Sequence, residues 1–407
     1  MKRSRVILVA LLFLLSWITY LDRAAISTAK ELMAGDLGLS DQTMGIVFGC
    51  FALGYAVAQV PAGWFADRFG PRTALTAVVA GWSLFTAVTG AVSRISILIV
   101  VRFLFGMAEA GVFPGAARTF YNWLPSDQHG KANGIIFSGS RLGAAFSFPI
   151  LAALMDRFGW RLAFFVLGFP GILWAAAWLF WFRDQPPQPV AKKATGQEEL
   201  HFAEVFRSRP MLLAMAQYFA SNFTFFICIS WMHPYLMSWY HLSSEVAAWY
   251  STIVLLIGAT AQWITGFLVD RLYRSRCREF SRSVPAIIGF LIAAAGLIAI
   301  GFTRAPWAGA ACFALATFGV EMTISPSWSF CIDLGKKKSG SVSGAMNMVG
   351  NLGSFVSASL FPLMYQSTGD AKSYFLLAAA LNVAAATVWL AMRAGQKDLA
   401  IEESCNV

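Results

Sequence analysis

The sequence predicts an all-α membrane protein with twelve transmembrane helices, arranged as two pseudo-symmetric bundles of six. Of its 407 residues, 57% are hydrophobic and 13% are charged, whereas soluble proteins are about 25% charged. Apolar runs of about 20 residues, the length of a membrane-spanning helix, recur along almost the whole chain. Short motifs also recur in the two halves, which indicates that a six-helix unit is repeated.

The helices of the first half are expected at residues 6–26, 42–65, 73–92, 95–118, 132–155 and 162–182. The first helix has a basic start like a signal peptide, but its apolar run continues into Tyr20-Leu21-Asp22-Arg23 without an evident cleavage site, so it is expected to remain. Residues 183–209 are rich in polar residues and predict a cytoplasmic linker, which could hold a short amphipathic helix at 198–206. The expected parts are therefore 1–182, 183–209, 210–395 and a cytoplasmic tail at 396–407.

The distribution of basic residues predicts the orientation in the membrane. Of the 31 lysines and arginines, 21 fall on the inner side and four inside predicted spans, and the outer side has only six, namely Lys30, Arg94, Arg157, Arg161, Arg304 and Lys372. This bias places both termini in the cytoplasm, and it explains the net charge of +10 without a nucleic-acid partner. We expect a multi-pass protein of the cell (inner) membrane.

Charged side chains inside the predicted spans are the first candidates for function. Each costs about 2.5–3.5 kcal/mol near the bilayer centre, and seven are predicted there: Asp22, Arg23, Arg102, Glu109, Arg118, Arg141 and Glu321. Arg102 and Glu109 share one helix face about 10 Å apart, too far for a direct ion pair, so each needs another partner. The alternative is that these groups only hold helices together, above all Arg118, which could lie at a helix end.

Two motifs occur once in each half. Gly63-x-x-x-Asp67-Arg68 is repeated as Gly266-x-x-x-Asp270-Arg271, and a glutamate precedes a proline by five residues at Glu109 and again at Glu321. The glycines permit close helix approach, the aspartate can accept from a helix N-terminus or an arginine, and the proline permits a kink. A gating loop is predicted from these features, with the residues Gly63, Asp67, Arg68, Gly70, Arg72, Asp270 and Arg271.

The segment Gly63 to Arg72 resembles the signature loop of major facilitator transporters. Tyr20-Leu-Asp22-Arg23, together with Arg102-x-x-x-Gly106-x-x-Glu109-Ala-x-x-Phe113-Pro114, resembles the anion:cation symporter family within them. That family includes bacterial carriers of hexuronate, galactonate and glucarate and is related to sialin and the vesicular glutamate transporters. The resemblance covers nearly the whole chain and implies the major facilitator fold.

The resemblance implies that Asp22 and Glu109 couple protons, and that Arg23 and Arg102 handle an anionic substrate and pair with those acids. A guanidinium can hold a carboxylate with two parallel hydrogen bonds, and Arg23 is the first choice for this contact. We hypothesise that Glu109 neutralises Arg23 in the empty carrier and that protonation of Glu109 frees Arg23. Asp22, paired with Arg102, would provide a second proton-linked contact.

Other substrate contacts are predicted with less support from motifs. Tyr20, Tyr55 and Gln59 could bind a polyol or could only pack, while Ser327, Trp328, Asn347 and Asn351 are selected by position alone. Arg141 and Glu321 match no pattern of the resembled family and bear on the size and charge of the substrate. The four histidines, His129, His201, His233 and His241, lie at helix ends or in loops and receive no role. The scattered cysteines predict no disulfide, metal site or cofactor.

The predicted function is a proton-coupled symporter that imports a small organic anion, most simply a sugar acid, as a monomer. One alternative is an exporter or exchanger of aromatic acids or drugs, which a more apolar cavity would favour. Another is a non-transporting sensor, for which an added cytosolic domain is expected. An enzyme is not predicted, because the sequence has no GxSxG, HExxH or P-loop motif. Sodium in place of protons stays open.

Overall fold

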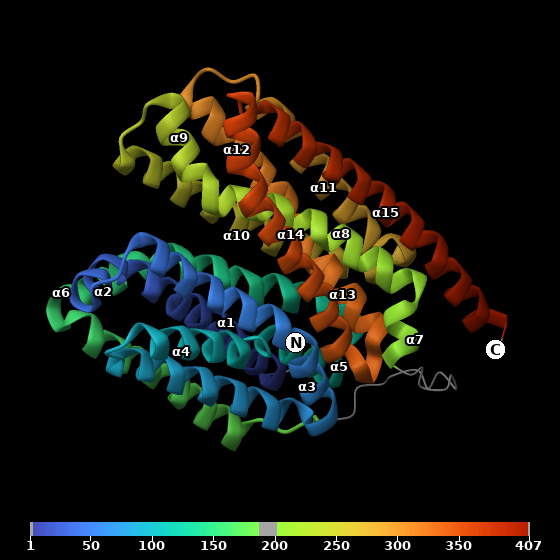
Figure 1. The fold of residues 1–407 in the computed structure, drawn as a ribbon. Helices are drawn as coiled ribbons and strands as arrows, with labels where there is room; N and C mark the ends of the chain where they lie inside the picture. Colours follow the sequence, from blue (N-terminus) through green and yellow to red (C-terminus); the bar gives the residue numbers. More distant parts are fainter. Residues whose placement is uncertain (1–2, 187–201, 406–407) are drawn as a thin grey trace. The chain divides into compact units, whose positions relative to one another are not determined.

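The computed structural model describes residues 3–186 and 202–405, and within these ranges it is helical without β-strands (Figure 1). The first half contains α1 (Arg3–Thr28), α2 (Lys30–Leu37), α3 (Asp41–Ala91), α4 (Ile95–Glu109), α5 (Val112–Trp123), the short 3₁₀ turn η1 (Ser126–Gln128) and α6 (His129–Trp181). The second half contains α7 (Phe202–Arg207), α8 (Arg209–Phe226), the π-helical turn η2 (Ile227–Trp231), α9 (Met232–Tyr240), α10 (Ser244–Arg274), η3 (Arg278–Phe280), α11 (Ser283–Ile300), α12 (Pro306–Met322), α13 (Ile324–Gly335), η4 (Lys336–Lys338), α14 (Ser339–Thr368) and α15 (Lys372–Cys405).

Two of the helices are too long for one membrane crossing. α3 has 51 residues and α6 has 53, about 75–80 Å if straight, whereas the bilayer core is about 30 Å thick. Each is interrupted by one glycine with positive φ, Gly70 (φ 81°) in α3 and Gly159 (φ 72°) in α6, and so supplies two spans. With α4–α5, α8–η2–α9 and α12–α13 each counted as one span, the described residues contain the twelve predicted helices, and the predicted fold class is confirmed.

The predicted helix at 95–118 is interrupted after its glutamate. α4 ends at Glu109, and α5 begins at Val112. The second half repeats this break, because α12 ends one residue after Glu321 and α13 follows after Thr323. Five residues after each glutamate a proline lacks the N–H that would bond four residues back. The helix is therefore interrupted near the proline in both halves, and each break lies beside a carboxyl group.

The described residues form two compact units that interleave along the chain. The first consists of residues 3–123, 139–186 and 334–344, and the second of residues 124–138, 202–333 and 345–405. Helices α6 and α14 therefore each begin in one unit and continue in the other. The division of the chain predicted from sequence remains a prediction. Residues 187–201 of the predicted linker lie outside the described residues, and α7 occupies its last part.

Close helix packing positions the charged residues of the first unit. A Cβ on Gly54 of α3 would lie 2.1 Å from the Phe103 carbonyl oxygen, and one on Gly106 of α4 would lie 2.2 Å from that of Phe51. The two backbones can approach this closely only because both positions lack a side chain. Figure 1 shows α3 alongside α4. This packing brings residues 51–55 of α3 against the stretch of α4 that carries Arg102 and Glu109.

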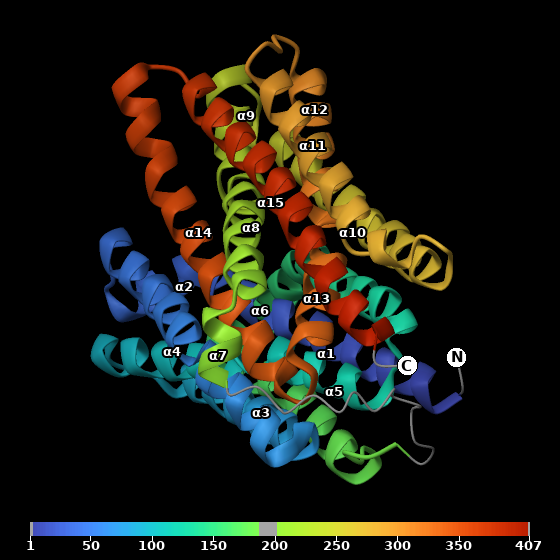
Figure 2. The same cartoon turned by 90° about the vertical axis from the view of Figure 1, so that its right-hand side faces the viewer.

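The second unit has an aromatic core. α11 packs against α12 and α15, and α15 also packs against α8, an arrangement visible in both views (Figures 1 and 2). Rings from α8, α9, α12, α14 and α15 meet in this core and include Phe223, Tyr235, Phe313, Phe361 and Phe375. This core supports the helices that carry Glu321 and the residues around it.

Candidate functional site

A buried ion pair between α1 and α4 forms the centre of the candidate site in the first unit. Nε of Arg23 donates to Oε1 of Glu109, whose side chain is 0% exposed, while that of Arg23 is 22% exposed. Oε2 of Glu109 and Nη2 of Arg23 are both buried without a hydrogen-bond partner. Each group of the pair therefore keeps one buried atom that can bind a further partner. This is the contact that the sequence hypothesis assigned to the empty carrier.

Aromatic rings surround the Arg23 guanidinium. Its central carbon lies 4.9 Å from the ring centre of Tyr20, 5.4 Å from that of Phe51 and 4.6 Å from that of Tyr55. Each ring face attracts a cation. The rings also replace part of the solvent around Arg23, which strengthens its electrostatic interactions. Two of the three, Tyr20 and Tyr55, are predicted site residues, whereas the sequence argument missed Phe51.

Arg102 is buried beside this pair but takes no part in it. Its side chain lies on α4, is 2% exposed, and stacks on Phe105 and Phe51 with its central carbon 4.5 and 5.2 Å from their ring centres. Its Nε has no hydrogen-bond partner. Among the described residues, no carboxylate lies within ion-pairing distance of Arg102. Arg102 is thus a cation held by aromatic rings.

Asp22 lies against α3. Its Oδ2 accepts a hydrogen bond of 3.0 Å from Nε1 of Trp82, and both residues are buried. The ion pair that the sequence argument expected between Asp22 and Arg102 is not found in the described part of the chain. Oδ2 of Asp22 accepts from Trp82 instead. Trp82 was missed by the sequence argument, since one tryptophan in an apolar helix carries no local signal.

Two further predicted residues lie in the first unit. Arg141 on α6 donates from Nη1 to the Tyr20 hydroxyl at 3.4 Å, which joins it to the rings around Arg23. Gln59 on α3 is fully buried, and neither atom of its amide has a hydrogen-bond partner within the described structure. An unsatisfied buried polar group costs about 1–3 kcal/mol. Gln59 therefore has capacity for a ligand that brings hydroxyl groups.

The second unit holds a buried carboxyl group of its own. Glu321 on α12 accepts from the amide of Gln262 on α10, and both side chains are fully buried. The sequence argument named Glu321 but missed Gln262, although a signal was present. Gly266 lies 203 residues after Gly63, and Gln262 lies the same 203 residues after Gln59. Gln59 and Gln262 therefore occupy equivalent positions in the two halves, and both are buried.

The remaining predicted contacts of the second unit are mostly satisfied within the protein. Ser327 donates to the Thr323 carbonyl at 2.6 Å and to Gln217 at 3.1 Å, and Nε1 of Trp328 donates to the Tyr218 hydroxyl at 2.8 Å. Asn351 donates to the Asn347 carbonyl at 2.8 Å. The side-chain amide of Asn347 makes no hydrogen bond to any described residue. Asn347 thus keeps more capacity for a ligand than the other three.

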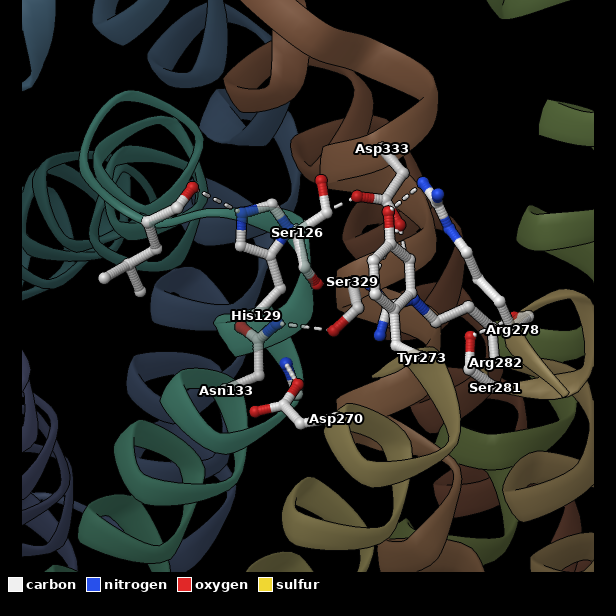
Figure 3. Close-up of polar contacts among 12 residues, drawn as sticks. Ser126, His129, Asn133, Asp270, Tyr273, Arg278, Ser281, Arg282, Ser329 and Asp333 are labelled. Carbon is white, nitrogen blue, oxygen red and sulfur yellow. Dashed lines mark hydrogen bonds and ion pairs between the residues drawn. The ribbon is translucent and has the colours of Figure 1, made fainter. Parts of the chain in front are cut away.

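Each repeated aspartate caps the start of a helix in its own unit. In the first unit, Asp67 accepts from the backbone of Gly340 and Ser341 at 2.9 and 2.7 Å and from the Ser341 hydroxyl at 2.6 Å, at the start of α14. In the second unit, Asp270 accepts from the backbone of Gly130 and Lys131 at 2.8 and 3.0 Å, at the start of α6 (Figure 3). Both carboxylates meet a positive helix end.

The glycines of the motif act as the sequence argument expected. A Cβ on Gly63 would lie 2.4 Å from the Gly340 carbonyl oxygen, and one on Gly266 would lie 2.7 Å from that of Gly130. Arg118 lies 3.8 Å from Asp67, which places it at this helix end and outside the Arg23 cluster.

The turn after Asp67 is held separately. Gly70 has positive φ, and a Cβ there would meet the Asp184 carboxylate at 2.7 Å. The backbone N–H of Arg72 donates to Oδ1 of Asp184, and the guanidinium of Arg72 donates to the Leu179 carbonyl. Arg68 and Arg271 are exposed.

A repeated helical unit with a buried cluster of charges defines a multi-pass membrane transport protein. The chain belongs to the Major Facilitator Superfamily, whose family model matches residues 12–358. A Cupriavidus necator protein named as a probable sulfoacetate transporter is 29% identical over 93% of this chain and 91% of its own. The hexuronate transporter of Bacillus subtilis is 29% identical over 94% of this chain and 93% of its own. The D-galactonate transporter of Escherichia coli is 27% identical over 94% of each chain. These names confirm the resemblance found in the sequence.

Solved structures agree on the fold. The human organic anion transporter MFSD10 superposes with a TM-score of 0.75 at 15% identity, covering 96% of this chain and 100% of the other. The transporter FucP in its outward conformation superposes with a TM-score of 0.76 at 14% identity, covering 96% and 99%. At these identities the likeness concerns the arrangement of helices alone.

Proposed function

We propose that this protein is a proton-coupled symporter that imports a small organic anion, most simply a sugar acid, across the cell (inner) membrane by alternating access. The Arg23–Glu109 pair carries the proposal, because it joins a proton-binding group to an anion-binding group in a buried place. The relatives named for sulfoacetate, hexuronate and galactonate transport support an anionic substrate. The basic residues support cytoplasmic termini, and we propose a monomer.

The charges of the cluster provide a mechanism for coupling. Arg23 and Arg102 balance Asp22 and Glu109 when both acids are ionised, and Arg141 adds one positive charge beside them. Protonation of one acid leaves an excess positive charge in a buried site, which is costly unless an anion enters. A substrate carboxylate would restore the balance, so proton and substrate favour the same occupied state. Gln59 would then donate to a substrate hydroxyl group.

In the state described, the guanidinium of Arg102 is the one that could accept a substrate anion without first losing a carboxylate partner. Arg23 is occupied by Glu109, whereas Arg102 has no carboxylate partner among the described residues. A carboxylate or sulfonate could bind Arg102 first, and protonation of Glu109 would release Arg23 as a second contact. This order revises the sequence argument, in which Arg23 alone took the substrate first.

Uptake into proteoliposomes tests the proposal. Labelled galactonate, glucuronate, glucarate and sulfoacetate are supplied outside, with an inward proton gradient and with the gradient collapsed by an ionophore. We expect accumulation of at least one anion only with the gradient. Equal uptake in both conditions would refute proton coupling, and a sodium gradient added in its place would identify sodium.

The second candidate function is export or exchange of aromatic acids. The observation in its favour is the ring lining of the cluster, where Tyr20, Phe51, Tyr55 and Phe105 surround the two guanidinium groups. Vesicles preloaded with benzoate-type acids separate the two functions. Efflux of these acids without uptake of any sugar acid would favour the exporter.

A further inference from the structure

One face of α10 (Ser244–Arg274) presents exposed apolar side chains along most of the helix. They are between 37% and 65% exposed and follow one another at intervals of three, four and eight residues, namely Trp249, Ile253, Leu256, Ile264 and Phe267. Side chains at these intervals lie on one side of a helix. Because α10 is long and apolar enough to cross a membrane, we expect this face to contact acyl chains.

The length of this face matches the hydrocarbon core of a bilayer. Trp249 and Phe267 are 18 positions apart, which corresponds to about 27 Å of helix, and the core is about 30 Å thick. Phe267 therefore lies near one boundary of the core. Arg271, four residues further along the same face, is about 6 Å beyond it, at the level of the lipid headgroups.

A second cation reaches this face from α6. The ammonium of Lys131 lies 4.7 Å from the ring centre of Phe267, whose side chain is 52% exposed. The backbone N–H of Lys131 donates to Oδ2 of Asp270 at 3.0 Å, which fixes the start of the side chain beside α10. The exposed ring of Phe267 thus neighbours two cations from different helices, Lys131 and Arg271.

The side chains of Lys131 and Arg271 form no ion pair with any residue that the structure describes. Arg271 is also exposed. Three other arginines at this end of the second unit are engaged within the protein, namely Arg274 with Asp127, Arg278 with Tyr273 and Arg282 with Asp333. Figure 3 shows the last two of these contacts. Lys131 and Arg271 therefore remain available for an anion from outside the chain.

The acids nearby do not neutralise these two cations. Residues 124–131 and 270–282 together contain six lysines and arginines but only three acids, Asp127, Asp270 and Glu279. Asp127 pairs with Arg274, and Asp270 is fully buried and accepts from backbone N–H groups. Glu279 lies on η3, beyond the end of α10. An excess of basic residues at the membrane surface attracts anionic lipids.

We propose that Lys131, Arg271 and the exposed face of α10 form a binding site for an anionic phospholipid of the phosphatidylglycerol type. The lipid phosphate accepts charge-assisted hydrogen bonds from both cations, and the acyl chains follow Phe267 and Ile264 toward Leu256. The occupant is a lipid and not a free phosphate, because the apolar face continues directly from the cations. The site is separate from the Arg23 cluster and does not depend on the proposed symport.

Photo-crosslinking tests where the lipid binds. The full chain is placed in phosphatidylcholine nanodiscs with a small fraction of phosphatidylglycerol that carries a diazirine on an acyl chain, and modified residues are identified by peptide mass spectrometry. We expect adducts concentrated on residues 263–271. Excess unlabelled phosphatidylglycerol should remove them, whereas phosphatidylethanolamine with the same chains should not. Adducts spread evenly over exposed helices, or removed equally by both lipids, would overturn the proposal.

A soluble competitor distinguishes a lipid from a free phosphate. Glycerol phosphate has the charged group without the acyl chains, so we expect it to leave the adducts on residues 263–271 unchanged. Their removal by glycerol phosphate would overturn the assignment of a lipid as the occupant.

Lys131→Gln and Arg271→Gln test the two cations. Each basic residue beside an anionic lipid contributes about fivefold in affinity. The mole fraction of photoreactive lipid that gives half-maximal adduct on residues 263–271 should therefore rise about fivefold in each variant and about 25-fold in the double variant. Size-exclusion elution at the position of the parent protein shows that each variant is folded. An unchanged mole fraction in the double variant would overturn the proposal.

Arg68→Gln is the matched control. Arg68 lies 203 residues before Arg271, at the equivalent position of the repeat, and is likewise exposed one turn after an exposed ring, that of Trp64. Because Arg68 belongs to the first unit, loss of its charge should leave the adducts on residues 263–271 unchanged. An equal loss of adducts in this variant would show that total charge controls lipid binding, and would overturn the proposed site.

Discussion

Arg23 and Glu109, 86 residues apart in the sequence, form an ion pair that leaves Nη2 of Arg23 and Oε2 of Glu109 without hydrogen-bond partners among the described residues. A substrate carboxylate therefore has a vacant guanidinium nitrogen to approach before the pair is broken. In the proposed mechanism, a proton bound to Glu109 would release Arg23. Glu109 and Arg23 are consequently the first residues to vary.

Glu109→Gln should separate coupling from binding. Glutamine keeps the shape of the side chain but cannot bind or release a proton, so Arg23 stays permanently available. We expect exchange of labelled for unlabelled substrate across proteoliposomes to be partly retained, while accumulation driven by a proton gradient is lost. Normal accumulation against a gradient by this variant would eliminate Glu109 as the coupling group.

Arg102→Lys should weaken substrate binding. Lysine keeps the charge but loses the planar group that matches a carboxylate and stacks on Phe105. A hydrogen bond to a charged group contributes about 1.5–3 kcal/mol, so we expect KM for uptake to rise about 10- to 150-fold. The matched control is Arg161→Lys, an arginine 40% exposed and paired with Asp36, for which KM should not change. An unchanged KM in Arg102→Lys would exclude this residue from substrate binding.

Trp82→Phe should alter the pH dependence of uptake. Phenylalanine retains a ring but removes the N–H that donates to Asp22, so the Asp22 carboxyl group loses this hydrogen bond. A hydrogen bond to a charged group contributes about 1.5–3 kcal/mol, so the pH profile of uptake should differ from that of the parent protein. Trp174→Phe, which removes a donor to the Leu11 carbonyl instead, is the control. Identical pH profiles would show that Trp82 only packs.

Asp67→Ala should destabilise the start of α14. Three hydrogen bonds to one carboxylate are lost, and the backbone N–H groups of Gly340 and Ser341 lose their acceptor. We expect a loss of about 1.5–3 kcal/mol, visible as a fall of several degrees in the apparent Tm in detergent. Arg68→Ala, at the exposed neighbouring position, should leave Tm within about one degree, since exposed substitutions usually change stability by less than about 0.5 kcal/mol.

Gly106→Ala should disturb the packing that assembles the cluster. The added methyl group would lie 2.2 Å from the Phe51 carbonyl oxygen, so α3 and α4 must separate and the rings must leave the guanidinium groups. We expect a lower yield of folded protein and loss of uptake. Gly49→Ala places the same methyl group on α3 with no neighbour within 4 Å and should be neutral or slightly stabilising. Full uptake in both variants would contradict the role of this packing.

The sequence predicted the residue types of the cluster better than their partners. Asp22 and Arg23 are adjacent on α1, so their side chains point about 100° apart around the helix. Arg23 faces Glu109, whereas Asp22 faces Trp82. Motif spacing identified both residues but did not show that they face different partners. The expected ion pair between Asp22 and Arg102 is therefore not found among the described residues.

The sequence predicted the contacts of the loop that contains Asp67 in the same incomplete way. The acceptor role of Asp67 and the need for Gly63 follow from spacing and chain flexibility, but the helix that donates lies 273 residues further on. Such a distant partner is fixed by tertiary packing and leaves no local signal. His129 shows the same limit, because its side-chain partner Asp333 lies 204 residues further on.

The interleaving of the units bears on how the protein is made. Asp67 is synthesised long before Gly340, so the first unit lacks the start of α14 until most of the chain has been made. α6, in turn, emerges before Asp270 exists to cap it. Neither half translated alone could complete its unit, and separately expressed halves should mature only when both are present in the same membrane.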